Sequence, residues 1–240
     1  MSGTRALVPT AVKQMRGFTL VEVLVSLLII ALMALMSWRG VTSMTTHQVR
    51  LADRADRLQT LNATLAQWQH DLDALVEMER VLTWSWDGQT FRMTRMGISP
   101  ETLGDALQVV AWTMRKEPFE SGEAYIERWQ SESFISHDDW NRAWANAELW
   151  AQLNPKEFVG VSHRLQVTSK FQIYIFRDKS WTNPLSSEGA PVQRAAENLP
   201  RESPNRMPAG VRLVVAPTDV AGLEGDLTVD WADIRLRMSP

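Results

Sequence analysis

The sequence predicts an α+β protein. We expect a long N-terminal α-helix, transmembrane over its first third and amphipathic over the remainder, packed on a mainly antiparallel β-sheet domain. Three observations predict this fold: a mainly apolar run from Phe18 to Trp38, a heptad-like repeat that continues it, and, after Met78, short alternating segments separated by turn residues. The chain has 240 residues, 45% of them hydrophobic and 22% charged, which leaves room for one sizeable globular domain besides the helix.

The apolar run is long enough to cross a membrane as a helix. It contains 21 residues, and at about 1.5 Å per residue such a helix covers about 30 Å, the thickness of one bilayer core. Glu22 is its only charged residue. An ionised carboxylate inside a bilayer costs on the order of 3 kcal/mol, so Glu22 should have a partner or a task. We expect Trp38 at the membrane interface and the following residues in the membrane helix: Phe18, Leu20, Val21, Val23, Leu24, Leu27, Leu28, Ile29 and Ile30.

The block Arg16-Gly17-Phe18-Thr19-Leu20-Val21-Glu22 resembles the N-terminal signature of type IV pilins and of the pseudopilins of type II secretion. The resemblance implies that residues 1–17 are a leader, that prepilin peptidase cleaves between Gly17 and Phe18, and that the new Phe18 amine is N-methylated. It also implies that Glu22 pairs with the amino terminus of a neighbouring subunit during assembly. Cleavage creates a cation beside an apolar segment, and a buried anion is tolerated when a cation meets it.

Three alternatives to a pilin-type signal predict different features of the chain. A secretory signal would have a shorter apolar core of about 7–15 residues and an exit with small residues, which this sequence lacks. A passive single-span module would keep Met1, and Glu22 would then be incidental. A membrane-tethered periplasmic enzyme would show clustered titratable groups in a pocket of the globular part.

Charge and cysteine content exclude several functions. The chain has no cysteine, which rules out disulfides and thiolate metal sites. Its formal net charge is −3, and loss of the leader, which carries Arg5, Lys13 and Arg16 and no acid, would leave the mature chain near −6. The sequence contains no basic tract that would bind nucleic acid electrostatically. The basic leader favours a cytoplasmic N-terminus, which places everything after Trp38 across the membrane. The resemblance implies that this is the bacterial inner membrane, which the chain would cross once, and that the globular domain lies in the periplasm.

The heptad-like repeat predicts that the helix continues over residues 39–78. No glycine or proline interrupts residues 41–78, so we expect one helix of roughly 60 residues from Phe18, about 90 Å long. The part from Leu58 to Leu75 is expected to join the core, whereas Met44 and Leu51 are expected to face partner subunits. The repeat consists of Met44, Leu51, Leu58, Leu65 and Leu72, with Leu61, Trp68 and Leu75 at the intervening positions.

Residues 79–240 are expected to form the periplasmic α+β domain. An Asp87-Gly88 turn predicts a β-hairpin, and Ser136 is a candidate cap for a helix. The expected elements are the hairpin strands Val81–Trp86 and Gln89–Met96, a strand Leu107–Arg115, a helix Asp138–Leu153, strands Val161–Val167, Phe171–Arg177, Gly210–Ala216 and Leu227–Met238, and a mobile proline-containing loop Asn183–Pro208.

Several C-terminal blocks resemble the J-type minor pseudopilin of type II secretion. They are Leu107–Trp112, Phe171–Phe176, Lys179–Pro184 and Met207–Leu213. The resemblance implies a place at the tip of the periplasmic pseudopilus, with the I- and K-type minor pseudopilins, the major pseudopilin, prepilin peptidase and inner-membrane lipid as partners. A Trp-rich insertion at about 116–158 departs from the pattern. A minor pilin of a type IV pilus, used for adhesion, motility or DNA uptake, is the alternative.

No residue type or spacing predicts catalysis, a metal site or a cofactor. The four histidines, at positions 47, 70, 137 and 163, are far apart in the sequence, and no phosphate-binding glycine loop or HExxH motif occurs. Asp71 and Asp73 are expected on the solvated face of the long helix, and Asp138 and Asp139 in the first turn of a helix. Trp140 and Trp144 are candidates for an exposed partner surface, because tryptophan is common at interfaces.

Overall fold

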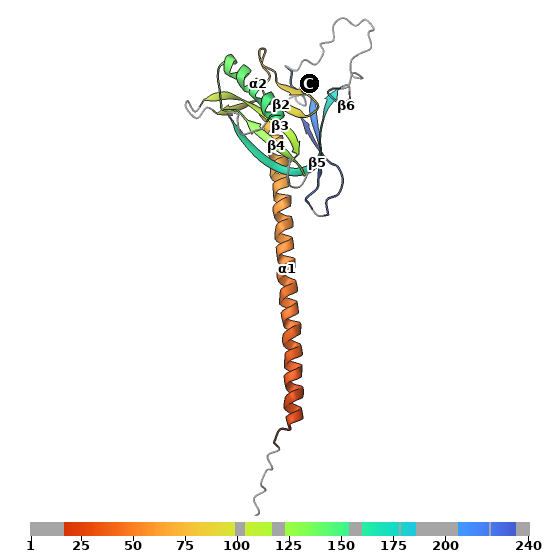
Figure 1. Cartoon of the computed structure of the whole chain (residues 1–240). Helices are drawn as coiled ribbons and strands as arrows, with labels where there is room; N and C mark the ends of the chain where they lie inside the picture. Colours follow the sequence, from red (N-terminus) through yellow and green to blue (C-terminus); the bar gives the residue numbers. More distant parts are fainter. Residues whose placement is uncertain are drawn as a thin grey trace, which may run out of the picture. The chain divides into compact units, whose positions relative to one another are not determined.

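The computed structural model describes residues 17–98, 104–116, 123–153, 160–177, 179–185, 206–220 and 222–233. The chain divides into two compact units, Met1–Ala52 and Asp53–Pro240. Helix α1 (Leu20–Asp73) begins in the first unit and ends in the second. The secondary structure is thus a long N-terminal helix followed by a mainly antiparallel β domain that contains one further helix, which confirms the predicted fold class (Figure 1).

The β-strands of the second unit form one antiparallel sheet in the order β1-β2-β3-β4-β5-β7-β8, with β6 paired to β5. Strand β5 joins its two halves, since Val161–Val167 pairs with β4 and Thr168–Ile175 pairs with β7. The strands are β1 (Trp84–Trp86), β2 (Thr90–Ile98), β3 (Asp105–Lys116), β4 (Ala124–Gln130), β5 (Val161–Arg177), β6 (Ser180–Thr182), β7 (Gly210–Pro217) and β8 (Leu227–Ala232).

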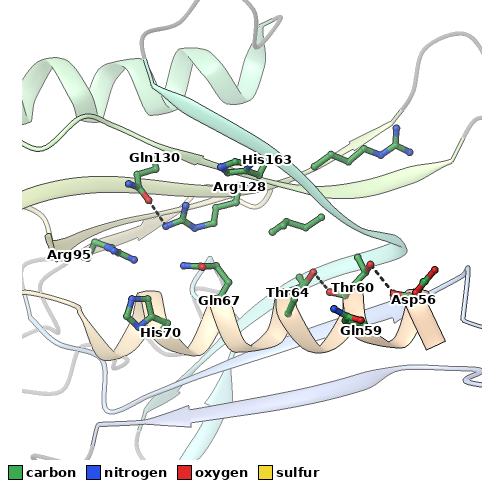
Figure 2. Close-up of a pocket in the computed structure, with 13 residues that line it drawn as sticks. Asp56, Gln59, Thr60, Thr64, Gln67, His70, Arg95, Arg128, Gln130 and His163 are labelled. Carbon is green, nitrogen blue, oxygen red and sulfur yellow. Dashed lines mark hydrogen bonds between the residues drawn. The ribbon is translucent and has the colours of Figure 1, made fainter. Parts of the chain in front are cut away.

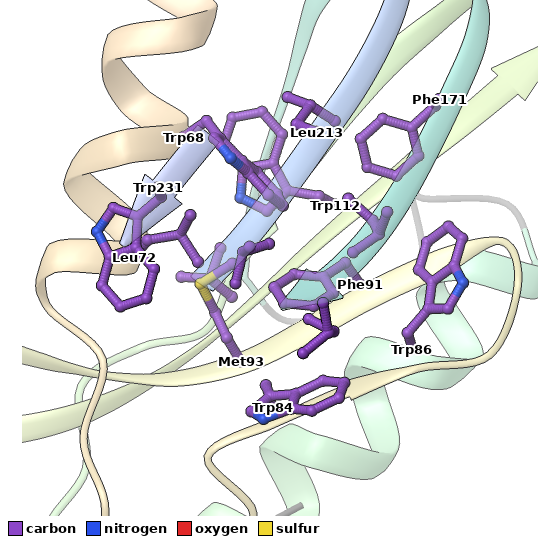
Figure 3. Packing of buried hydrophobic residues seen from close by; sticks show 14 of the residues in the cluster. Trp68, Leu72, Trp84, Trp86, Phe91, Met93, Trp112, Phe171, Leu213 and Trp231 are labelled. Carbon is purple, nitrogen blue, oxygen red and sulfur yellow. The ribbon is translucent and has the colours of Figure 1, made fainter. Parts of the chain in front are cut away.

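The last part of α1 packs on one face of this sheet through the predicted stripe. Trp68 is fully buried, and its ring lies 5.3 Å from those of Phe91 and Trp112. Leu61, Leu72 and Leu75 are also buried, whereas Leu58 is 37% exposed, so the core begins one turn later than predicted. Figure 3 shows this aromatic core, whose labelled members are Trp68, Leu72, Trp84, Trp86, Phe91, Met93, Trp112, Phe171, Leu213 and Trp231.

Helix α2 (His137–Gln152) covers the other face of the sheet, over β2 and β3 (Figure 1). Its small residues Ala143, Ala147 and Ala151 let it approach closely, and Trp150 stacks on Trp129 at 6.2 Å. The predicted cap is confirmed, because the Ser136 side chain accepts a hydrogen bond from the Asp139 N–H. Hydrogen bonds from Arg142 and Ser136 lower the pKa of Asp139, which lies in the first turn as predicted.

The prediction that Trp140 and Trp144 form an exposed partner surface is wrong. Trp140 is 6% exposed, and its indole N–H donates to the Thr94 hydroxyl at 2.9 Å. Trp144 is half-buried, stacks on Trp140, and lies beneath the Arg92 guanidinium at 5.1 Å. The same spacing of four residues that suggested a shared outer face instead places both rings on the face that α2 turns towards the sheet.

Several predicted boundaries also differ from the structure. Helix α1 ends at Asp73 rather than near Met78, because Leu75 leaves the helix to form a β-bridge with Arg95. The two strands expected over 161–177 are one bulged strand, β5. The region 116–158 supplies β4 and α2, which belong to the sheet and the core. Strand β8 ends at Ala232, and most of the predicted loop 183–208 lies outside the described residues.

Candidate functional site

The residues at the predicted cleavage point lie at the very start of α1. Gly17, Phe18 and Thr19 precede the helix, which begins at Leu20. Thr19 caps it, since its carbonyl oxygen accepts from the N–H groups of Glu22 and Val23 at 3.0 and 3.2 Å, and its hydroxyl lies 3.3 Å from the Glu22 N–H. Phe18 is 79% exposed, and a Cβ atom added to Gly17 would contact nothing within 4 Å. The Gly17–Phe18 bond is therefore accessible in this structure.

The first part of α1 presents apolar side chains on all sides. It is long and apolar enough to cross a membrane, and none of its apolar stretch is buried. Trp38, predicted at the membrane interface, is 72% exposed. Burial of large apolar side chains contributes about 1.5–3 kcal/mol each, so this surface favours lipid or another protein over water. Its exposed members include Leu20, Val21, Val23, Leu24, Leu27, Leu28, Ile29 and Ile30.

Glu22 lies in the first turn of α1, one helical turn after Phe18. Its side chain is exposed and, among the described residues, it forms no ion pair. A carboxylate in the first turn interacts favourably with the positive end of the helix dipole, and Cβ atoms tilt towards the helix N-terminus. The carboxylate is thus directed towards the end of the helix at which cleavage would create an amine.

A second carboxylate of α1, Asp71, has the opposite environment and was predicted wrongly. It is fully buried rather than solvated. Arg128 donates to both of its oxygens, from Nε at 2.7 Å and from Nη2 at 2.9 Å, and the Trp112 indole N–H donates at 2.9 Å. Gln67 donates at 3.0 Å, and Arg95 completes the set. Asp71 therefore ties the last turn of α1 to β2, β3 and β4.

A second buried carboxylate, Glu127, lies on the other face of β4. It accepts from the Arg115 guanidinium and from the Ser162 hydroxyl. Arg115 in turn donates to the carbonyl oxygens of Trp150 and Leu153 at the C-terminal end of α2, and it stacks on the Trp150 ring at 4.7 Å. This network holds α2 against the sheet and pairs the buried charge of Glu127.

Beside Asp71 lies an open cavity of about 790 Å³, formed entirely by residues of the Asp53–Pro240 unit. Figure 2 shows it between α1 and strands β2, β4 and β5. The helix contributes Asp56, Gln59, Thr60, Ala63, Thr64, Gln67 and His70, and the strands contribute Arg95, Arg128, Gln130, His163, Arg164 and Leu165. Within the described ranges, no three His, Asp or Glu side chains come together as a set of metal ligands.

Comparison with known proteins identifies the N-terminal segment. Residues 12–38 match the prokaryotic N-terminal methylation motif. The match confirms that the block around Gly17 and Phe18 belongs to this class of signal; the roles of the individual residues stay predictions. No curated protein matches the chain. Among solved structures, a chain of the GspK-GspI-GspJ complex from the enterotoxigenic Escherichia coli type 2 secretion system is similar at 13% identity and a TM-score of 0.41, over 73% of this chain and 96% of that chain.

The predicted site residues lie close together in the sequence, whereas the residues that the sequence analysis missed lie far from their partners. Gly17, Phe18 and Glu22 are consecutive or one turn apart, so a local pattern was sufficient to bring them together. Asp71 is separated from Arg95 by 24 residues and from Arg128 by 57. Nothing in the local pattern distinguishes Asp71 from the other acids of the helix, and only the strand order brings its partners to it.

Proposed function

We propose that this chain is a minor pseudopilin of a type II secretion system, of the J type, and that it is a structural subunit rather than an enzyme. Prepilin peptidase would cleave it between Gly17 and Phe18, and the mature helix would anchor it in the bacterial inner membrane with the Asp53–Pro240 unit in the periplasm. It would then join the tip of the pseudopilus with the I- and K-type minor pseudopilins, above the major pseudopilin.

The observation that carries this proposal is the N-terminal methylation motif at residues 12–38, followed by a helix whose apolar stretch is unburied. A bulky side chain at Gly17 would not disturb the described structure, since a Cβ there meets nothing within 4 Å. A requirement for a small residue at Gly17 would therefore come from the close approach of a peptidase active site. The blocks between Leu107 and Leu213 that resemble the J-type minor pseudopilin support the subtype.

Glu22 would act during assembly. Cleavage would leave the Phe18 amine two residues before the start of α1, where a positive charge is unfavourable because of the helix dipole. A carboxylate from an adjacent subunit would neutralise that amine and fix the axial position of one helix against the next. Such pairing would also relieve the cost of Glu22 in an apolar surface.

Deletion and complementation in the native host test this function. We expect deletion to abolish release of secreted proteins and the wild-type chain to restore it. Gly17→Leu should fail to restore it, because the leader is retained, whereas Gly40→Leu, a matched change at a helical glycine whose Cβ would also meet nothing within 4 Å, should restore it. Normal secretion after deletion, together with loss of twitching or DNA uptake, would instead identify a pilin of a type IV pilus.

A further inference from the structure

The cavity beside Asp71 plays no part in the function proposed above, and its walls have a distinctive composition. On one side, residues from Asp56 to His70 of α1 line it. These positions span 15 residues, a rise of about 21 Å along the helix. On the other side lie Arg95, Arg128 and a run of three consecutive residues of β5, from His163 to Leu165 (Figure 2).

The run of three consecutive strand residues indicates that the edge of β5 borders the cavity. Successive side chains of a strand point to opposite faces. His163 pairs across from Arg128, whose guanidinium binds Asp71 on the α1 face, whereas the Arg164 guanidinium stacks on Tyr125 at 4.1 Å. Arg164 nevertheless lines the cavity, so the cavity reaches the outer edge of β5, where the stem or the main chain of Arg164 lies.

This edge of β5 lacks a neighbouring strand within the described part of the chain. Residues Val161–Val167 use one edge to pair with β4, and β7 pairs with β5 only from Thr168 onwards. The N–H of Thr218 reaches the Val167 carbonyl oxygen, which closes the far end of the gap. An unpaired strand edge is a template for an additional strand, because main-chain hydrogen bonds supply affinity in any sequence.

The charge along the cavity is not uniform. At the His70 end, the single carboxylate of Asp71 lies between two guanidinium groups, Arg95 and Arg128, so one positive charge is left over. Arg95 Nε is buried and has no acceptor within the described ranges. At the opposite end the helix contributes Asp56. A ligand with a carboxylate at the His70 end would therefore meet a complementary charge.

We propose that this cavity binds an extended segment of a partner protein as an additional strand on the free edge of β5, with an Asp or Glu side chain of that segment beside Arg95 and His70. An extended chain advances about 3.4 Å per residue, so the cavity accommodates about six residues. The inference requires only the Asp53–Pro240 unit, so it stands or falls separately from the cleavage and assembly proposed above.

Blocked six-residue peptides test this proposal on the full chain in detergent micelles. Each peptide alternates Val and Thr and carries one Glu at its first or its last position, so that both strand directions are tested. Binding is measured by fluorescence anisotropy, and amide hydrogen exchange of Val161–Val167 locates the peptide. We expect saturable binding of one Glu peptide with slower exchange in that stretch, and about tenfold weaker binding when Gln replaces its Glu.

Two controls separate strand addition from simple charge attraction. A peptide with N-methyl groups on alternate residues keeps its charge but cannot donate main-chain hydrogen bonds along one of its two edges. Two such methylation patterns are possible, and the one that blocks the edge facing β5 should abolish binding. Arg95→Gln should reduce the preference for Glu over Gln to near one, while Arg142→Gln, at an exposed position on α2, should leave it at about tenfold. Arg128 keeps both bonds to Asp71 in the Arg95 variant, which preserves the fold.

The proposal is overturned by absence of saturable binding, by equal binding of both N-methylated peptides, or by unchanged exchange of Val161–Val167. An unaltered Glu preference in the Arg95→Gln protein would overturn the placement of the carboxylate.

Discussion

The two ends of helix α1 carry carboxylates in opposite situations. Glu22 is exposed, stands among apolar side chains and has no ion-pair partner in the described structure, whereas Asp71 is fully buried and accepts hydrogen bonds from Arg95, Arg128, Trp112 and Gln67. The folded chain therefore satisfies Asp71 by itself. Under the function proposed above, the Phe18 amine of an adjacent subunit would be the partner of Glu22.

The same contrast holds for two tryptophans of α1. Trp68 is fully buried and packs against Phe91 and Trp112, while Trp38 is 72% exposed. Replacement of Trp68 by Ala should lower the free energy of unfolding by about 4 kcal/mol, since it removes a large core side chain and leaves a cavity. Trp38→Ala should change it by less than about 0.5 kcal/mol. Denaturant unfolding of the full chain in detergent, followed by near-UV circular dichroism, compares the two. Equal losses of unfolding free energy in the two variants would contradict the assignment of Trp68 to the core and of Trp38 to a surface outside it.

Loss of the Asp71 charge should also destabilise the fold. Asp71→Asn leaves Arg95 and Arg128 without a counter-charge in a buried site, which should cost about 3 kcal/mol. The matched control is Asp53→Asn, an exposed carboxylate on the same helix, for which we expect a change within about 0.5 kcal/mol. The same unfolding assay measures both. A neutral effect of Asp71→Asn would show that this network does not hold the helix end to the sheet.

Glu22→Ala should leave folding untouched and weaken assembly. The main-chain groups of Glu22 bond to the side chains of Thr19 and Ser26 within the same apolar segment, and its exposed carboxylate lies outside the core, so the unfolding free energy should not change. Co-purification with the partner minor pseudopilins should fall about tenfold, the equivalent of about 1.4 kcal/mol, for the loss of one charge pair. Glu22→Gln, which retains a hydrogen-bond acceptor, should recover an amount of partner between that of the wild type and that of Glu22→Ala. Wild-type recovery of partners with Glu22→Ala would remove the role given to this carboxylate.

The smallest expected effect concerns an ion pair on the surface of the sheet. Two hydrogen bonds from Arg212, each 2.7 Å long, lower the pKa of Asp230. A lowered pKa in the folded state adds stability at a pH above the unfolded value of about 3.9, and this stability is lost as the pH falls through the folded pKa. Because the pair is partly exposed, it should contribute less than about 1 kcal/mol. The free energy of unfolding of Asp230→Asn should thus be lower than that of the wild type at neutral pH, and the two values should converge in acid. A difference that persists in acid would indicate that Asp230 stabilises the fold through packing instead.

Local patterns predicted the parts of this molecule that depend on neighbours in the sequence. The apolar run, the cap at Ser136 and the turn at Gly88, whose φ of 98° favours glycine, all follow from residues within one or two turns of one another. Strand β4 was missed because its centre, Glu127-Arg128, consists of two charged residues, and a pattern based on polarity places such a pair in solvent. Only the pairing of β4 with β3 and β5 supplies the partners that allow these charges to be buried.

The residues of the candidate site likewise differ in whether the sequence could predict them. Gly17, Phe18 and Glu22 could be named from the sequence because they belong to a contiguous signal. The cavity beside Asp71 could not, because it is assembled from α1, β2, β4 and β5, whose relative positions follow from the strand order. No heptad position or spacing indicates which face of the helix will meet Arg95 and Arg128.

The intact mass of the protein extracted from membranes of a host with an active prepilin peptidase tests the central claim most directly, since the partner of Glu22 is held to be an amine that exists only after cleavage. We predict a chain that begins at Phe18 and is heavier by one methyl group than the bare mature sequence. A mass that includes residues 1–17 would contradict the account.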